Sequence, residues 1–212
     1  MRLDKVILKA ALSTLAAILA LLAAMILLLS FAFPQTMTGI TYSMGMDSLS
    51  VHFATDAYNR TNKVEYIAHA TEVSIGLNDY PKIDELGERL IADDEFAAYC
   101  AERNEALPEA AQGKTTYEEY LYRAVCVAKY KSGEKSGAVE RAQELLLGAF
   151  KRNNPVVAVL RAAIVAEDKD TVEMIESELL GLDDSSLSAE DKQYLSDVLA
   201  TVEEWNTTDT DE

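Results

Sequence analysis

The chain's two histidines are the first side chains to consider for chemistry. His69 lies four residues after Glu65 and three before Glu72, so a helix would place these three side chains on one face. An imidazole between two carboxylates can bind a metal ion. Di-iron bundles use a related spacing, but they need four contributing helices with more inward-facing acids. We therefore expect a solvated face or pairing between helical turns, with no metal and no cofactor.

The two cysteines offer either a disulfide or two small buried side chains. Cys100 and Cys126 could pair outside the cytoplasm, where disulfides persist. Both also fall on apolar faces of predicted helices, where a free cysteine packs as a small hydrophobic residue. No histidine lies near them in the sequence, so they do not predict a metal site. The sequence leaves both alternatives open.

The sequence contains none of the short motifs that mark common catalytic or nucleotide-binding sites. It has no Gly-x-Ser-x-Gly, His-Glu-x-x-His, P-loop or Gly-x-Gly-x-x-Gly pattern. Acidic runs such as Asp93-Asp94-Glu95 and Asp183-Asp184 do not predict glycoside hydrolysis, because that chemistry needs two carboxylates across a cleft rather than in sequence. We therefore expect that the protein is not an enzyme.

The element that most clearly positions the chain is the apolar segment from Ala10 to Phe33. Its 24 residues include no charge, and a helix of this length reaches ~36 Å, enough to cross the ~30 Å core of a bilayer. A buried core helix would show a polar face, which this segment lacks. A cleaved signal peptide would have a shorter apolar stretch, although Ser30-Phe31-Ala32 could serve as its cleavage site. We expect an uncleaved transmembrane helix over residues 10–33.

The basic residues that flank this segment predict its orientation. Arg2, Lys5 and Lys9 precede the segment, and the next basic residue is Arg60. Because positively charged flanks remain in the cytoplasm, residues 1–9 should be cytoplasmic and everything after residue 33 extracytoplasmic. We expect a single-pass protein of the plasma membrane, from a bacterium.

The remainder of the chain has the spacing of an all-α domain. Residues 34–46, rich in Thr, Gly, Ser and Met, should form a juxtamembrane linker. Apolar residues recur at helical spacing through residues 47–205, with Leu49 and Phe53 among the expected buried positions, and no alternating run predicts a strand. Residues 206–212 should be a disordered polar tail.

Capping residues set the approximate limits of the predicted helices. Thr115 or Thr116 should begin one helix, and Asn154 followed by Pro155 should begin another. From Val156 to Ala166 only Arg161 is polar, so this helix should be buried on nearly all sides. The predicted helices cover residues 47–59, 63–76, 82–91, 94–104, 116–131, 136–150, 155–166, 171–180 and 189–205.

Two turns and a few side chains follow the pattern of a helical repeat family. The turns at Gly133 and Asp168 lie 35 residues apart, close to the ~34-residue period of tetratricopeptide hairpins. Ala138 and Ala142 fall where that family's second helix carries small residues, and Tyr122 falls at its aromatic position. The segment from Tyr122 to Leu146 therefore resembles a tetratricopeptide repeat.

This resemblance implies a tetratricopeptide-like α-solenoid of antiparallel helix hairpins, with a groove that binds peptides or partner proteins. The chain departs from the family pattern where Val125-Cys126 replaces a Leu-Gly pair and Lys129 replaces a tyrosine. The closing proline is also missing. The first half of the chain follows the pattern only loosely.

Charge also bears on the kind of partner. The chain has 19 basic and 36 acidic residues, a net charge of −17, which argues against binding nucleic acid. Residues 114–161 are an exception, with 9 basic and 5 acidic residues. Lys129, Lys131, Lys135 and Arg141 in this segment could bind an acidic peptide.

Together these features predict a membrane-anchored protein–protein interaction or scaffold protein. Two alternatives stay open. An enzyme or small-ligand receptor would need a pocket with a polar side chain such as His69 or Arg161 at its base. A self-associating structural or sensor protein could pair its anchor helices through Ala16, Ala20 and Ala24. The sequence predicts neither the partner's identity nor the oligomeric state.

Overall fold

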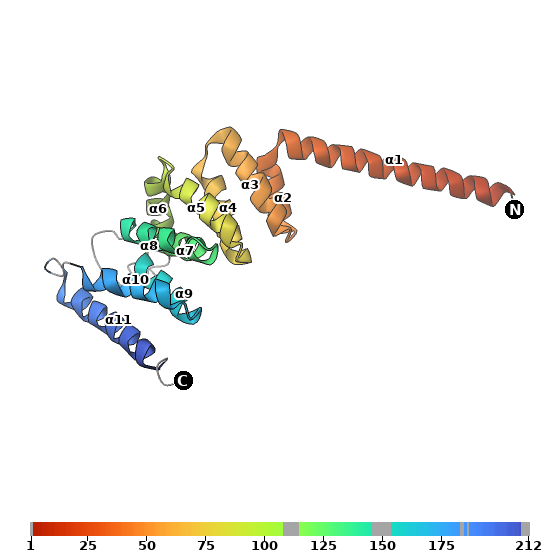
Figure 1. Cartoon of the computed structure of the whole chain (residues 1–212). Helices are drawn as coiled ribbons and strands as arrows, with labels where there is room; N and C mark the ends of the chain where they lie inside the picture. Colours follow the sequence, from red (N-terminus) through yellow and green to blue (C-terminus); the bar gives the residue numbers. More distant parts are fainter. Residues whose placement is uncertain (1, 108–114, 146–153, 183–184, 186, 209–212) are drawn as a thin grey trace. The chain divides into compact units, whose positions relative to one another are not determined.

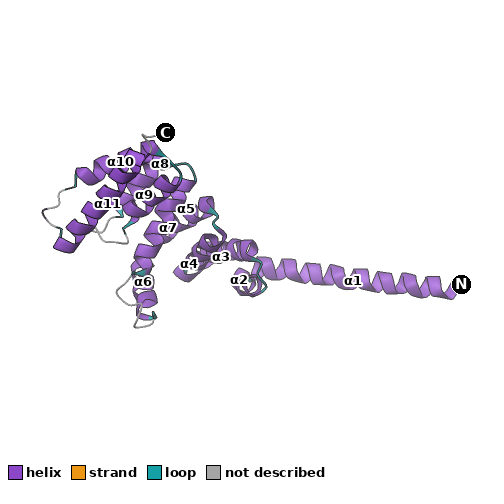
Figure 2. Ribbon diagram, turned by 90° about the horizontal axis from the view of Figure 1, so that it is seen from below, coloured by secondary structure: helices purple, strands orange, loops and turns teal. Residues whose placement is uncertain are grey.

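The described part of the chain is built from helices alone, as Figures 1 and 2 show. The computed structural model describes residues 2–107, 115–145, 154–182, 185 and 187–208. Within these residues the all-α prediction is confirmed, and no strand is present. Contacts divide the chain into two compact units, Met1–Val73 and Ser74–Glu212.

The first unit begins with α1 (Arg2–Ala32), which projects beyond the other helices of this unit (Figure 1). Its stretch Leu8–Ala32 is the one helix in the described residues that is long and apolar enough to cross a membrane. These 25 residues are unburied in the structure and span ~37 Å, compared with ~30 Å for a bilayer core. Length and composition fit either a membrane span or a signal sequence.

The predicted linker over residues 34–46 is wrong, because most of it forms helix α2 (Pro34–Ser43). Pro34 occupies the start of the helix, where a missing N–H costs nothing. The helix packs on α3 (Asp47–Thr61) and buries Met37, Thr38 and Thr41. The two threonine hydroxyls donate to backbone carbonyls one turn earlier in the helix, at 2.9 and 2.7 Å. Their burial therefore leaves no hydroxyl without a hydrogen bond.

Leu49 is a second departure from the expected pattern, since its side chain on α3 is 48% exposed. Phe53 on the same helix is buried as predicted. The unit ends within α4 (Val64–Leu77).

The second unit contains the helices that the capping residues predicted. Thr116 forms a capping box with Glu119 at the start of α7, and the Asn154 side chain accepts a hydrogen bond from the Val157 N–H at the start of α9. The elements are α5 (Tyr80–Ile91), α6 (Phe96–Glu105), α7 (Tyr117–Lys131), α8 (Lys135–Glu144), α9 (Pro155–Val165), α10 (Lys169–Leu180) and α11 (Ala189–Thr208).

Three predictions concern residues that are only partly, or not at all, among the described ones. α11 continues to Thr208, so residues 206–208 of the predicted disordered tail are helical. Residues 209–212, residues 146–150 of the predicted helix 136–150, and the pair Asp183-Asp184 lie outside the described residues.

Helix α7 is the centre of the second unit, because α5, α6, α8 and α9 all pack against it. Leu121 and Val125 are fully buried, and so is Cys126, which the sequence placed on an apolar helix face. A helix with neighbours on several sides needs a wider apolar surface than a single stripe.

Helix α9 is less enclosed than predicted. Its first two turns are buried, including Val157 and Leu160, but Arg161 is exposed and Val165 is 81% exposed. The tetratricopeptide-like arrangement itself stays a prediction.

The central position of α7 generates a stability prediction. Leu121→Ala should lower the free energy of unfolding by about 2–5 kcal/mol, because it leaves a cavity at a fully buried position. The matched control Leu180→Ala, on the exposed face of α10, should change it by no more than about 0.5 kcal/mol. Urea unfolding of the full chain in detergent, followed by circular dichroism, measures both. Equal effects of the two variants would contradict the central role of α7.

Candidate partner-binding site

The four basic residues predicted to bind a partner have different surroundings. Lys129 on α7 lies against α5, with its Nζ 3.1 Å from Oδ1 of Asp84 and 3.4 Å from Oε2 of Glu134. Both the Lys129 and the Asp84 side chains are largely buried. A buried ion pair of this kind fixes one helix against another, and losing one partner would leave a buried unpaired charge.

Arg141 on α8 is held in the same way. Its Nε and Nη2 donate to the two carboxylate oxygens of Glu88 on α5, at 3.0 and 2.7 Å, and its Nη1 donates to Glu144 at 2.8 Å. The parallel two-bond geometry with Glu88 is the strongest arrangement an arginine and a carboxylate form. Glu88 and Arg141 are 53 residues apart in sequence, so this pair ties distant parts of the second unit together.

Lys135 contributes to a third charged contact, centred on Asp168 at the start of α10. The Asp168 carboxylate lies 2.8 Å from the Lys135 Nζ and accepts hydrogen bonds from the Tyr130 hydroxyl at 2.9 Å and the Thr171 hydroxyl at 2.8 Å. Burial would raise the pKa of Asp168, but hydrogen bonds from Lys135, Thr171 and Tyr130 outweigh it and lower the pKa to about 2. The contact joins α7, α8 and α10.

Three of the four predicted side chains therefore have internal acidic partners. An acidic peptide would have to displace those partners before binding them. Lys131 differs, because it is exposed at the end of α7 and its Nζ lies 5.7 Å from the centre of the Tyr130 ring. Partner binding by this set remains a prediction, and Lys131 is the member best placed for it.

A second candidate site for a partner is a hollow beside α7, which the sequence did not predict. It has a volume of about 300 Å³, and residues of α5, α7 and α9 line it together with Ile75 and Asn78. Its walls from the three helices are mostly apolar or aromatic: Tyr80, Ile83, Tyr120, Ala124, Val127 and Ala158. We call this hollow the α5–α7–α9 groove.

Arg123 is the one charged side chain that lines this groove. It is partly buried, and no carboxylate pairs with it among the described residues. Tyr120, Arg123 and Val127 follow one another at helical spacing on α7, a pattern visible in the sequence. The sequence instead favours Lys129 and Lys131 on this helix, because they belong to the segment with an excess of basic residues.

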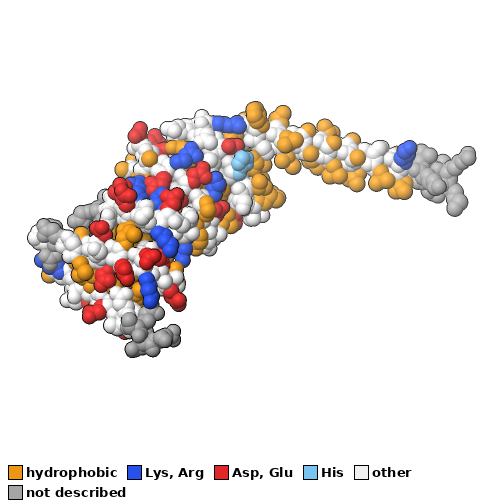
Figure 3. Space-filling view, in the orientation of Figure 1, with side chains coloured by type: hydrophobic (Ala, Val, Ile, Leu, Met, Phe, Trp, Pro, Cys, Tyr) orange, Lys and Arg blue, Asp and Glu red, His pale blue; other side chains and the backbone are white. Residues whose placement is uncertain are grey.

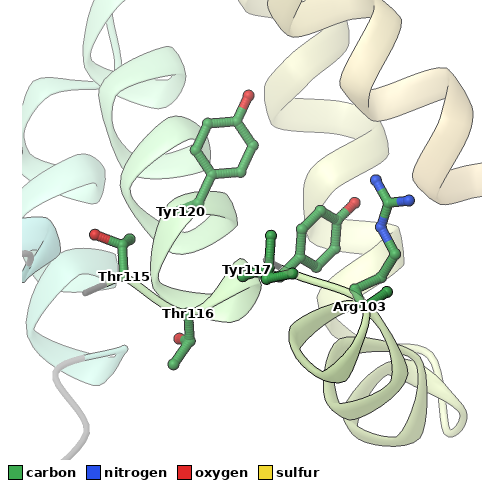
Figure 4. Close-up of a pocket in the computed structure, with 7 residues that line it drawn as sticks. Arg103, Thr115, Thr116, Tyr117 and Tyr120 are labelled. Atoms are coloured by element: carbon green, nitrogen blue, oxygen red, sulfur yellow. The ribbon is translucent and has the colours of Figure 1, made fainter. Parts of the chain in front are cut away.

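A second hollow, of about 380 Å³, lies between the end of α6 and the start of α7 (Figure 4). Figure 4 shows Tyr117 and Arg103 side by side, with the Arg103 guanidinium 5.1 Å from the centre of the Tyr117 ring. Tyr120 points away from them and borders both hollows. Its ring is therefore the wall that the two share.

His69 is partly buried and held by protein contacts, so the solvated alternative expected for its helix face is wrong for this residue. A hydrogen bond of 3.0 Å links its Nε2 to the Ser50 hydroxyl on α3, and its ring meets the Tyr42 ring edge-on at 4.9 Å. Burial lowers the pKa of His69. Glu65 is exposed and 3.8 Å from Lys63. In the described part of the chain, no group of three or more His, Cys, Asp or Glu side chains could hold a metal.

The two cysteines are free and buried, which settles the alternative that the sequence left open. Burial raises the pKa of both thiols to about 12. Cys100 and Cys126 are thus protonated side chains that fill the core. Arg161, the other polar residue considered for a pocket, is exposed and lies 3.5 Å from the Tyr194 hydroxyl.

The contact around Asp168 generates a prediction about pH. Because the folded pKa of about 2 lies below the ordinary 3.8, this carboxylate stabilises the fold above about pH 4 and loses that effect as the pH falls through 2. Asp168→Asn should therefore cost about 1–3 kcal/mol at pH 7, and the difference from the parent should shrink below pH 4.

The matched control is Asp170→Asn, which removes the same charge from an exposed position two residues away. It should leave the free energy of unfolding nearly unchanged at pH 7. Urea titrations of the full chain at several pH values provide the measurement. An Asp168→Asn variant as stable as the parent at neutral pH would show that the contact contributes nothing.

The chain matches no protein-family model, no curated protein and no solved structure. The function must therefore be inferred from the chemistry of its own residues.

Proposed function

We propose that the protein is a membrane-anchored adaptor. In this proposal α1 crosses the membrane once, and the second unit binds a segment of a partner protein in the α5–α7–α9 groove. The exposed apolar surface of α1 supports the first part, because such a surface is stable only when lipid or protein covers it. The basic residues Arg2, Lys5 and Lys9 at the start of α1 support a cytoplasmic N-terminus and an extracytoplasmic second unit, as in a bacterial plasma-membrane protein.

The observation that carries the second part is the position of Arg123. Other basic residues of the second unit, Lys82, Lys129 and Arg141 among them, lie within 4 Å of an acidic side chain. Arg123 has no such partner among the described residues, although the chain carries far more acidic than basic residues. A guanidinium at the wall of an apolar groove is suited to bind a carboxylate through two parallel hydrogen bonds.

The groove therefore fits a peptide segment that places an acidic side chain or a terminal carboxylate beside apolar side chains. Tyr120, Ile83 and Val127 would contact the apolar side chains, and aromatic walls are common at such sites. α5, α7 and α9 would be the first helices of three successive hairpins in the tetratricopeptide-like interpretation. That arrangement would place the groove where repeat proteins of this type bind their partners.

Photocrosslinking from inside the groove tests this function. A photoreactive residue replacing Val127, in the full chain in native membranes, should crosslink to one partner segment that mass spectrometry identifies as containing an acidic residue. Arg123→Glu should lower the yield at least about 10-fold, because the loss of a charge pair in an interface costs about 2–5 kcal/mol.

Two controls separate the groove from the exposed basic surface. Lys131→Glu makes the same charge change one turn beyond Val127 on the same helix, but outside the residues that line the groove, and should change the yield from position 127 far less than Arg123→Glu does. A probe at the exposed residue Glu140 of α8 should capture no such segment. If Lys131→Glu abolishes capture and Arg123→Glu does not, the basic surface rather than the groove binds the partner.

A further inference from the structure

We infer that α2 lies in the membrane–water interface, with its exposed face against lipid. This inference rests on the proposed membrane anchoring by α1 and adds a second membrane-contacting element to it. The binding partner of this face is thus a lipid surface rather than a protein.

The exposed face of α2 has an unusual composition for a helix in contact with water. Residues 36, 39, 40, 43 and 44 follow one another at helical spacing and are exposed, and they are Thr36, Gly39, Ile40, Ser43 and Met44. None is charged, and Met44 is 62% exposed. A helix face in water normally carries charged residues, as the face of α5 does with Lys82 and Glu85.

The absence of charge continues without a break from α1. No Lys, Arg, Asp or Glu occurs between Ala10 and Met46. Exposed large apolar side chains also concentrate at this point of the first unit: Phe33, Ile40, Tyr42, Met44, Met46 and Leu49. Figure 3 shows hydrophobic side chains where α2 adjoins the base of α1. An uncharged apolar surface that continues a membrane-spanning surface is suited to lipid.

Three of the hydroxyl groups of α2 are satisfied within the helix, as a region of low water content favours. The hydroxyls of Thr38, Thr41 and Ser43 all donate to backbone carbonyls of the same helix, at 2.9, 2.7 and 2.8 Å. Tyr42 is an exposed residue of the type that gathers at the interface, where a ring meets lipid and a hydroxyl meets water.

Contacts on the other side of α2 hold the helix at the end of α1. One residue, Phe33, separates the two helices. The Arg60 guanidinium at the end of α3 donates to the Phe31 carbonyl and lies 5.3 Å from the centre of the Phe31 ring. The Ser50 hydroxyl of α3 donates to the Thr38 carbonyl of α2 at 3.2 Å. Together these contacts hold α2, α3 and the end of α1 in one packed cluster, which would lie at the membrane surface.

Tryptophan fluorescence in vesicles tests the location of α2. The native Trp205 is first replaced by phenylalanine, and single tryptophans are then introduced as Met44→Trp, Leu22→Trp and Glu65→Trp in the full chain. Leu22 lies in α1 and serves as the bilayer reference, and Glu65 is an exposed charged position of α4 that serves as the water reference. Each variant is reconstituted into vesicles whose lipids carry bromine either near the headgroup or near the end of the acyl chain.

Tryptophan at position 44 should be quenched several-fold more strongly than at position 65, and more by the shallow bromine than by the deep one. Tryptophan at position 22 should be quenched by the deep bromine. If position 44 is quenched no more than position 65 while position 22 is quenched, α2 does not contact lipid and this inference fails alone. A position 22 that escapes quenching by either lipid would overturn the membrane anchor itself, and with it the proposed function.

Discussion

The uncharged stretch from Ala10 to Met46 constrains the rest of the molecule. Its helix α1 leaves a largely apolar stretch of 25 residues uncovered by the protein, and each Å² of apolar surface exposed to water costs about 25 cal/mol. Such a surface demands a bilayer or a partner. All of the acidic residues except Asp4 come after Met46. α2 then appears as the transition between these regions, buried on one face by α3 and uncharged on the other.

In the second unit, charge has mainly a structural use. Asp84, Glu88 and Asp168 bind Lys129, Arg141 and Lys135, and these pairs connect helices that are distant in sequence. Because several basic residues are engaged in this way, Arg123 stands out as a guanidinium directed to a groove rather than to an acid. In the proposed function, the binding residue Arg123 differs from the structural basic residues in its pairing rather than in its residue type.

Most of the helices could be predicted from the sequence, because their signals are local: Thr116 with Glu119, Asn154 with Pro155, and apolar residues at helical spacing. α2 was missed because two of its four buried residues are threonines, whose hydroxyls are satisfied only once the helix exists. The candidate site was missed for a different reason. Lys129 pairs with Asp84, which is 45 residues away in the sequence. Local sequence patterns do not predict which basic residues form ion pairs with such distant acidic residues.

The most direct test of membrane anchoring is the mass of the chain that remains in membranes after an alkaline wash. Anchoring by α1 predicts that the protein stays in the membrane fraction, and that its intact mass and N-terminal peptide include residues 1–32. A soluble chain that begins after Ala32 would contradict it, because α1 would then be a signal sequence removed at Ser30-Phe31-Ala32. In that case the helical domain would act free of the membrane.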